Sequence, residues 1–165
     1  MTEPATITPG TYGRDAIDLA ADPATWEIWP APSRYPEVLY QSFPEFTCRC
    51  PRSGYPDFAT IHLVSVPHEK VVELKHLKLW LNSFRDRPIS HELATAEIVR
   101  TLAETLDLHA IVVLMEYTPR GNLTTFPMVE YQHPRVHGLA PDDPLALALA
   151  NARFVKRRLI TRAIG

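Results

Sequence analysis

The spacing of apolar residues changes twice along this chain, and those changes limit the folds that it can adopt. Residues 58–66, "FATIHLVSV", alternate in two sets and contain many β-branched side chains, which is typical of a strand. From Glu73 to Phe84 apolar residues recur every three or four positions, which is the period of an amphipathic helix. Strand-like segments return at residues 109–119 and 122–131. The pattern therefore predicts strands, then helices, then strands again.

Turn and cap residues divide these segments into six elements. A further strand over residues 46–50 enters the turn "PRSGYPD". Pro88 ends the first helix, and Ser90 is a suitable N-cap for a second helix that continues to Leu106. Arg120 and Gly121 mark the turn between the last two strands. The order β-β-α-α-β-β predicts an α+β fold with a four-stranded antiparallel sheet covered by two helices.

Two flanking parts differ from this central unit, so we divide the chain into residues 1–40, 41–133 and 134–165. Nine of the 16 prolines fall in residues 1–56, which favours extended or turning chain in the N-terminal third. Within residues 26–40 the pattern indicates an ordered arm that packs its aromatics, and a disordered tail is the alternative for residues 1–15. The prediction of an ordered arm rests on Trp26, Trp29, Pro30, Pro32 and Pro36.

The C-terminal part reads as a separate helix. Asp143 is a good N-cap and Pro144 a good first helical residue. Apolar residues at helical spacing then form one face. Basic residues near its end suit the negative end of the helix dipole, and an anion or RNA contact is the second interpretation. They are Lys156, Arg157, Arg158 and Arg162.

Length and composition narrow the classes of protein. A chain of 165 residues suits one domain with a sizeable core. The net charge of -2 supplies no overall field that would attract nucleic acid. We see no apolar run of the length that a membrane span needs and no signal peptide. Two cysteines two residues apart are a poor disulfide framework, so we expect a reducing, cytoplasmic setting.

Those two cysteines have three interpretations that spacing alone leaves open. They can be free structural residues. Cys48 and Cys50 can bind zinc together with His62, His68 or His91. Finally, Cys50 can be a nucleophile at the end of a strand, with Asp57 returning across the turn as proton donor or acceptor.

Acidic and basic residues at the helix starts also have two interpretations. Glu73 and Glu92 are favoured in a first turn by the helix dipole alone. Alternatively, both glutamates, with His91 beside Glu92, bind the N–H edge of a purine-like ring. Lys75, Lys78 and Arg120 are either a solvated basic surface or contacts for the phosphates of a nucleotide.

Four segments together resemble a known family. "CPRSGYPDFATI", "VVELKHLKLWLNSFR", "HE" and "TPRG" occur in the order and spacing of the QueF family, and the resemblance spans residues 43–131. QueF enzymes are NADPH-dependent 7-cyano-7-deazaguanine reductases, which are nitrile reductases of queuosine biosynthesis, a tRNA modification. The chain is similar to their single-module form. The resemblance implies a tunnelling fold (T-fold) whose subunits join their sheets into a barrel, with active sites between subunits. It also implies a homo-oligomer, a decamer of two rings of five.

The resemblance further implies roles for individual residues. The family nucleophile matches Cys50, and Cys48 has no counterpart; the catalytic acid matches Asp57. Substrate binding is implied for Val72, Glu73, Leu74, His91 and Glu92. NADPH binding is implied for Lys75, Lys78, Arg120 and Gly121. No metal ion is implied.

The implied chemistry joins these residues in one reaction. The Cys50 thiolate attacks the nitrile carbon, Asp57 protonates the nitrogen, and a covalent thioimide forms. Two NADPH then reduce it to 7-aminomethyl-7-deazaguanine. Three positions depart from the family pattern: Ser90 replaces a phenylalanine that covers the base, His76 replaces a serine or alanine, and Asn122 replaces a glycine.

Other functions remain as alternatives. A QueF-like amidinotransferase acts on the nitrile in tRNA and lacks the cofactor segment, which is present here. A zinc-dependent GTP cyclohydrolase of the same fold needs Cys48, Cys50 and a histidine as ligands. A non-catalytic ring that binds a deazapurine or pterin is the fourth interpretation.

Overall fold

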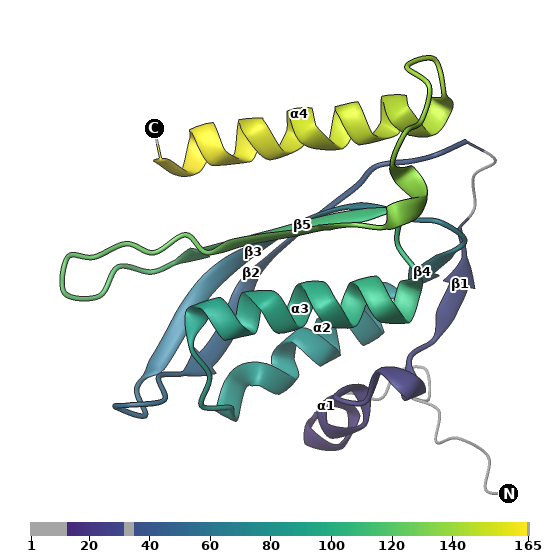
Figure 1. Cartoon of the computed structure of the whole chain (residues 1–165). Helices are drawn as coiled ribbons and strands as arrows, with labels where there is room; N and C mark the ends of the chain where they lie inside the picture. The colour runs from purple at the N-terminus through teal and green to yellow at the C-terminus, as the bar shows by residue number, and fades with distance from the viewer. Residues whose placement is uncertain (1–12, 32–34, 165) are drawn as a thin grey trace, which may run out of the picture.

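A four-stranded antiparallel sheet organises the chain (Figure 1). The computed structural model describes residues 13–31 and 35–164. The strand order is β2-β3-β5-β6, with α2 and α3 on one face of the sheet and α4 along the other. The strands are β2 (Leu39–Arg49), β3 (Pro56–Val66), β5 (Ala110–Tyr117) and β6 (Met128–Gln132). The helices on its faces are α2 (Leu74–Asn82), α3 (His91–Leu106) and α4 (Pro144–Ile164).

The predicted β-β-α-α-β-β order is confirmed, and additional elements surround it. A separate two-stranded sheet pairs β1 with β4, and a short helix, α1, precedes it. These elements are α1 (Arg14–Ala20), β1 (Ile28–Pro30) and β4 (Lys70–Val72). Three 3-10 turns complete the described chain: Pro23–Thr25, Ser83–Asp86 and Pro134–Val136.

The central strands are buried on both sides because helices cover both faces of the sheet. Ile61 and Leu63 of β3 join the core beneath α2 and α3. Their neighbours on the opposite face, Val64 and Val66, join a second cluster that α4 covers. Successive strand residues point to opposite faces, so a strand covered on both sides is apolar at nearly every position.

The last predicted strand is shorter than expected. We predicted residues 122–131, but β6 begins only at Met128. The chain first makes a tight turn in which Arg120 and Leu123 exchange backbone hydrogen bonds. Gly121 and Asn122 both have positive φ, 55° and 64°, which no strand residue adopts. The first residues of the predicted strand therefore belong to this turn and to the segment that leads into β6.

Side-chain caps start both central helices, and one predicted core residue is not in the core. Glu73 caps α2 and Ser90 caps α3, as expected for Ser90. Leu77 and Leu81 of the predicted apolar stripe are buried, whereas Leu74 is 64% exposed. Leu74 lines a cavity at the start of α2 instead of packing in the core.

The N-terminal arm differs from the prediction of extended chain. Helix α1 forms in residues 14–20, which contain no proline. The high proline content of the N-terminal third therefore did not prevent a helix in this stretch. Trp26 packs as predicted: it is buried and meets Trp80 of α2 edge to face, with centroids 5.1 Å apart. Trp29 is instead 51% exposed. Residues 1–12, which make up most of the alternative disordered tail, and Pro32 lie outside the described residues.

The C-terminal helix has the predicted start and the predicted apolar face. The backbone N–H of Leu145 donates to Asp143 Oδ1 at 2.8 Å. Leu149 and Ala152 are buried against the sheet, and Lys156 pairs with Glu130 of β6 at 2.7 Å. Within the described ranges, no helix combines the length and apolarity needed to cross a membrane.

Candidate active site

The turn after β2 separates the two cysteines. The Cys50 N–H donates to the Tyr55 carbonyl at 2.8 Å, and the Gly54 N–H donates back to the Cys50 carbonyl at 2.9 Å. Gly54 has φ 70°, a conformation that other residues rarely adopt, so the glycine permits this closed turn. Cys48 lies inside the core, while Cys50 is partly exposed at the end of the strand. The apparent pair "CRC" thus occupies two different environments.

The two thiols have opposite pKa shifts. Burial raises the pKa of Cys48 to about 11, which keeps it a neutral thiol. Hydrogen bonds from the Ser53 side chain, and then from the backbones of Ser53 and Arg52, lower the pKa of Cys50 to about 7, with help from Arg120. Because only the thiolate is a good nucleophile, these opposite shifts favour Cys50 over Cys48 as the reactive cysteine.

Asp57 lies close to Cys50 and is almost fully enclosed. Its residue pairs with Cys48 across the β2–β3 ladder, and its side chain is 3% exposed. Arg120 Nη1 forms a short ion pair with Asp57 Oδ1, and His91 Nε2 lies 3.4 Å from Oδ2. Arg120 also hydrogen-bonds Cys50, so one guanidinium contacts both the nucleophile and the carboxylate. The sequence did not predict this contact, because it assigned Arg120 to cofactor binding.

The start of α3 brings His91 to this group. The His91 ring stacks on Tyr117 of β5 with centroids 3.6 Å apart and an angle of 11°. Burial raises the pKa of the Tyr117 hydroxyl. Glu92 is exposed in the first turn of the same helix, where a ligand can reach it. Tyr117 was missed because it occupies an ordinary apolar position in a strand pattern.

We call Cys50, Asp57, His91 and Arg120 the cysteine cluster.

A second predicted group lies elsewhere. Glu73, between β4 and α2, accepts hydrogen bonds from the N–H groups of Lys75 and His76 at 2.8 and 3.1 Å. Burial opposes ionisation of Glu73, but these hydrogen bonds and one from the His76 ring outweigh it and lower its pKa.

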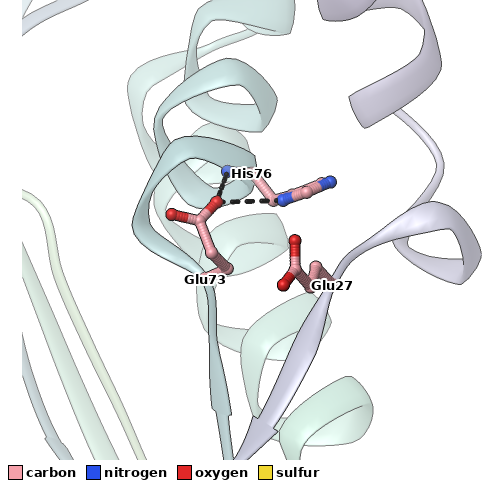
Figure 2. Close-up of side chains that lie close together, drawn as sticks. All are labelled: Glu27, Glu73 and His76. Atoms are coloured by element: carbon pink, nitrogen blue, oxygen red, sulfur yellow. Dashed lines mark hydrogen bonds and ion pairs between the residues drawn. The ribbon is translucent and has the colours of Figure 1, made fainter. Parts of the chain in front are cut away.

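Glu73, His76 and Glu27 form what we call the glutamate cluster (Figure 2). Glu27 precedes β1, and its carbonyl accepts a hydrogen bond from the Glu73 N–H at 2.9 Å. The other predicted substrate contacts here are Val72, which is buried, and Leu74, which is exposed. Sequence reasoning missed Glu27 because only the pairing of β1 with β4 brings it near Glu73.

The two clusters lie at opposite ends of the sheet. Asp57 is near the start of β3, whereas Ser65 near its end lines the same cavity as Glu73. Eight residues of strand span about 26 Å. Helices α2 and α3 lie side by side and run in opposite directions, connected by a 3-10 turn and a short loop, so Glu73 and Glu92 lie at opposite ends of the helical layer (Figure 1). Within one protomer, therefore, these two glutamates cannot contact the same base.

The predicted cofactor residues are also divided between the two ends. Lys75 and Lys78 are three residues apart on α2 and share one side of that helix. Arg120 and Gly121 lie in the turn next to the cysteine cluster, where the Arg120 side chain is 43% exposed. Two ammonium groups and a guanidinium are chemically suited to the phosphates of a dinucleotide such as NADPH.

The glutamate cluster is also the group of residues that could hold a metal ion in the described part of the chain. Glu27, Glu73 and His76 each offer one atom within 4.8 Å of the others. Neither cysteine belongs to such a group among the described residues. The zinc interpretation required Cys48 to share a ligand set with Cys50, but the Cys48 side chain faces the core.

Comparison with known proteins gives the family. A family model described as "QueF-like protein" matches residues 56–136. The chain is 49% identical over 109 residues to the NADPH-dependent 7-cyano-7-deazaguanine reductase of Aquifex aeolicus (strain VF5), covering 66% of this chain and 84% of that protein. It is 46% identical over 132 residues to the protein of the same name from Gloeobacter violaceus (strain ATCC 29082 / PCC 7421), covering 80% and 93%. This chain belongs to the QueF family.

One solved structure has a similar fold. It is described as the archaeosine synthase QueF-Like in the apo form and has a TM-score of 0.52 and 17% sequence identity. The match covers 59% of this chain and 94% of that chain. The likeness supports the tunnelling fold expected from the resemblance, and at this identity it concerns the fold alone.

Proposed function

We propose that this chain is an NADPH-dependent 7-cyano-7-deazaguanine reductase, which converts a nitrile to an aminomethyl group. The observation that carries the proposal is Cys50: a thiol with a pKa of about 7 beside a buried carboxylate. The chain is also 50% identical over 114 residues to the reductase of that name from Sulfurimonas denitrificans (strain ATCC 33889 / DSM 1251).

The first step joins enzyme and substrate. Cys50 Sγ attacks the nitrile carbon while the Asp57 carboxylate takes the thiol proton and passes it to the nitrile nitrogen, so that a neutral thioimide forms and Asp57 is a carboxylate again. The imidazole of His91, 3.4 Å from Asp57 Oδ2, is placed to return a proton to Asp57. Arg120 steadies both partners, because it hydrogen-bonds Cys50 and forms an ion pair with Asp57.

The reduction needs a hydride donor, and the chain carries residues suited to hold one. When bound, one NADPH would supply hydride to the thioimide carbon, and a second NADPH would supply hydride to the imine that follows. Lys75 and Lys78 of one subunit and Arg120 and Gly121 of another would hold the cofactor, because the two pairs lie at opposite ends of one chain. Cys50 leaves between the two reductions as a thiolate, which the hydrogen bonds from Ser53 stabilise.

The separation of the clusters supports an active site shared between subunits. Glu73 of one subunit and Glu92 of another can contact the same base, although in one protomer they lie far apart. Among the described residues the outer edges of β2 and β6 pair with no further strand, apart from a bridge between Arg49 and Pro88, so these edges can join neighbouring sheets into a barrel. We propose a homo-oligomer of two stacked rings of five, which acts in the cytoplasm on the free base.

The decisive experiment follows NADPH absorbance after 7-cyano-7-deazaguanine is added to the purified protein. We expect two NADPH consumed per substrate and a covalent adduct by mass spectrometry. Cys50→Ala should abolish both, whereas Cys48→Ala, the matched control, should retain them. Unchanged NADPH with a folded oligomer would contradict the proposal, and tRNA binding without NADPH binding would favour an amidinotransferase.

A further inference from the structure

His76 occupies a position that none of the roles above explains. It projects from the first turn of α2 toward Glu73 and Glu27 (Figure 2). Its side chain is only 2% exposed, and its Nδ1 lies 3.1 Å from Glu73 Oε2. A buried imidazole beside two carboxylates needs a physical explanation, because polar groups are costly to bury without partners.

The two carboxylate oxygens of Glu73 differ in their hydrogen bonds. Three hydrogen bonds end on Oε2: from the N–H groups of Lys75 and His76 and from the His76 ring. Figure 2 shows the other oxygen, Oε1, pointing away from His76. Glu73 also lines a cavity of about 380 Å³, and Oε1 accepts none of these three hydrogen bonds. The ring of His76 therefore helps to select which oxygen is presented.

The Glu27 carboxylate lies close to that of Glu73, so the His76 imidazole has a second carboxylate beside it. Its side chain is held by the indole N–H of Trp29, which donates to Oε1 at 2.8 Å. Its backbone is held by the hydrogen bond from Glu73 N–H to the Glu27 carbonyl. Two carboxylates within 4.8 Å repel each other, and a hydrogen-bond donor next to both offsets that repulsion. Without the His76 ring, the Glu73 side chain would be held by the two backbone N–H groups alone, and nothing would offset its repulsion by Glu27.

The arrangement favours a proton over a metal ion at this position. Nδ1 and Glu73 Oε2 are at hydrogen-bond distance, so a proton lies between them. The second ring nitrogen, Nε2, points away from both carboxylates (Figure 2) and has no hydrogen-bond partner in the described part of the chain. Of the two ring nitrogens Nδ1 is the one that faces the carboxylates, and a metal ion bound there would have to displace the proton that Nδ1 shares with Glu73.

We propose that His76 is a positioning residue that fixes the Glu73 carboxylate so that Oε1 accepts hydrogen bonds from the N–H groups of the deazaguanine base. This inference rests on the proposed function, because it takes Glu73 to contact that base. The Nδ1–H of His76 is the essential group. A side chain of similar size without a donor at that position should leave Glu73 loosely held.

The test compares two amide substitutions, in a Cys50→Ala background that binds substrate without covalent chemistry. The amide nitrogen of His76→Asn replaces Nδ1, whereas that of His76→Gln reaches the position of Nε2. His76→Gln should raise the calorimetric Kd for 7-cyano-7-deazaguanine by about 10-fold or more, and His76→Asn should stay within about threefold of the parent. With Cys50 restored, His76→Gln should raise KM about 10-fold and change kcat by less than about twofold.

The control is His62→Gln, which alters a buried histidine elsewhere on the sheet and should leave the Kd unchanged. Equal affinities of His76→Asn and His76→Gln, both folded by thermal unfolding, would overturn the inference. So would tight zinc binding that His76→Gln abolishes. A wild-type protein that fails to oxidise NADPH contradicts the proposed function instead, and the Kd comparison still tests His76. Absence of any base binding overturns both.

Discussion

The two ends of the sheet carry polar clusters that are built in different ways. At the cysteine cluster, ion pairs and a tight turn hold groups from β2, β3, α3 and the turn after β5. At the glutamate cluster, the start of α2 provides most of the hydrogen bonds, and a segment near the N-terminus adds Glu27. The first arrangement activates a thiol, whereas the second holds a hydrogen-bond acceptor still.

Because the two clusters are far apart in one chain, the roles proposed for Cys50 and for Glu73 can be altered separately. Changes at the cysteine cluster should affect bond formation, and changes at the glutamate cluster should affect affinity for the base. The connection between them passes through the sheet and helices, about 26 Å of packed structure.

The largest expected effect is at the cysteine cluster. Asp57→Asn preserves the shape of the side chain but removes the proton donor and the ion pair with Arg120. We expect kcat to fall by about 10²–10⁴-fold. Stopped-flow measurement of adduct formation checks this. Glu73→Gln is the comparison at the other end and should raise KM more than it lowers kcat. Equal losses of kcat in both variants would show that the two clusters do not have different roles.

The second effect concerns the support of the glutamate cluster. Trp26→Ala removes a buried indole that packs on Trp80 and should lower the free energy of unfolding by about 3–5 kcal/mol. Because Trp26 directly precedes Glu27, KM for the base should rise, while the alkylation rate of Cys50 should stay the same. Urea titration and iodoacetamide labelling measure the two quantities. A parallel change in Cys50 reactivity would show that the ends are coupled.

The third effect is the pH dependence of the thiol. A lowered pKa means that Cys50 ionises at lower pH than an ordinary thiol, so its alkylation rate should rise with pH around a midpoint of about 7. Cys48 should resist labelling up to far higher pH, because burial raises its pKa to about 11. Ser53→Ala removes the hydrogen bond that lowers the Cys50 pKa most and should move the midpoint upward. An unmoved midpoint would assign the shift to the backbone N–H groups of Ser53 and Arg52 and to Arg120.

The smallest effect tests a residue that belongs to neither end. Asp143→Ala removes the N-cap of α4 and should cost about 1 kcal/mol of stability, while KM and kcat stay unchanged. Thermal unfolding combined with steady-state kinetics measures both. Altered kinetics would give α4, on the other face of the sheet, a part in the reaction.

Local features of the fold were predictable, and the composition of the site was predictable only in pieces. Ser90 and Asp143 were identified as caps because a cap depends on a hydrogen bond that spans two or three residues. The family resemblance singled out Cys50 and Asp57, which lie within one turn and its flanking strands. It could not place Glu73 and Glu92 at opposite ends of the helical layer, nor predict that Arg120 meets Asp57, 63 residues away in the chain.

The sequence by itself determined the order of strands and helices, because apolar periodicity and cap chemistry act over a few neighbouring residues. The family resemblance pointed to Cys50, but the spacing of the two cysteines gave no physical reason why one thiol should be more reactive than the other. Burial of Cys48 between sheet and helices, and exposure of Cys50 beside Ser53 and Arg120, supply that reason. Nor did the sequence determine that Glu27 and His76 join Glu73. Those outcomes depend on solvation and charge, which are set by segments that meet only when the chain is folded.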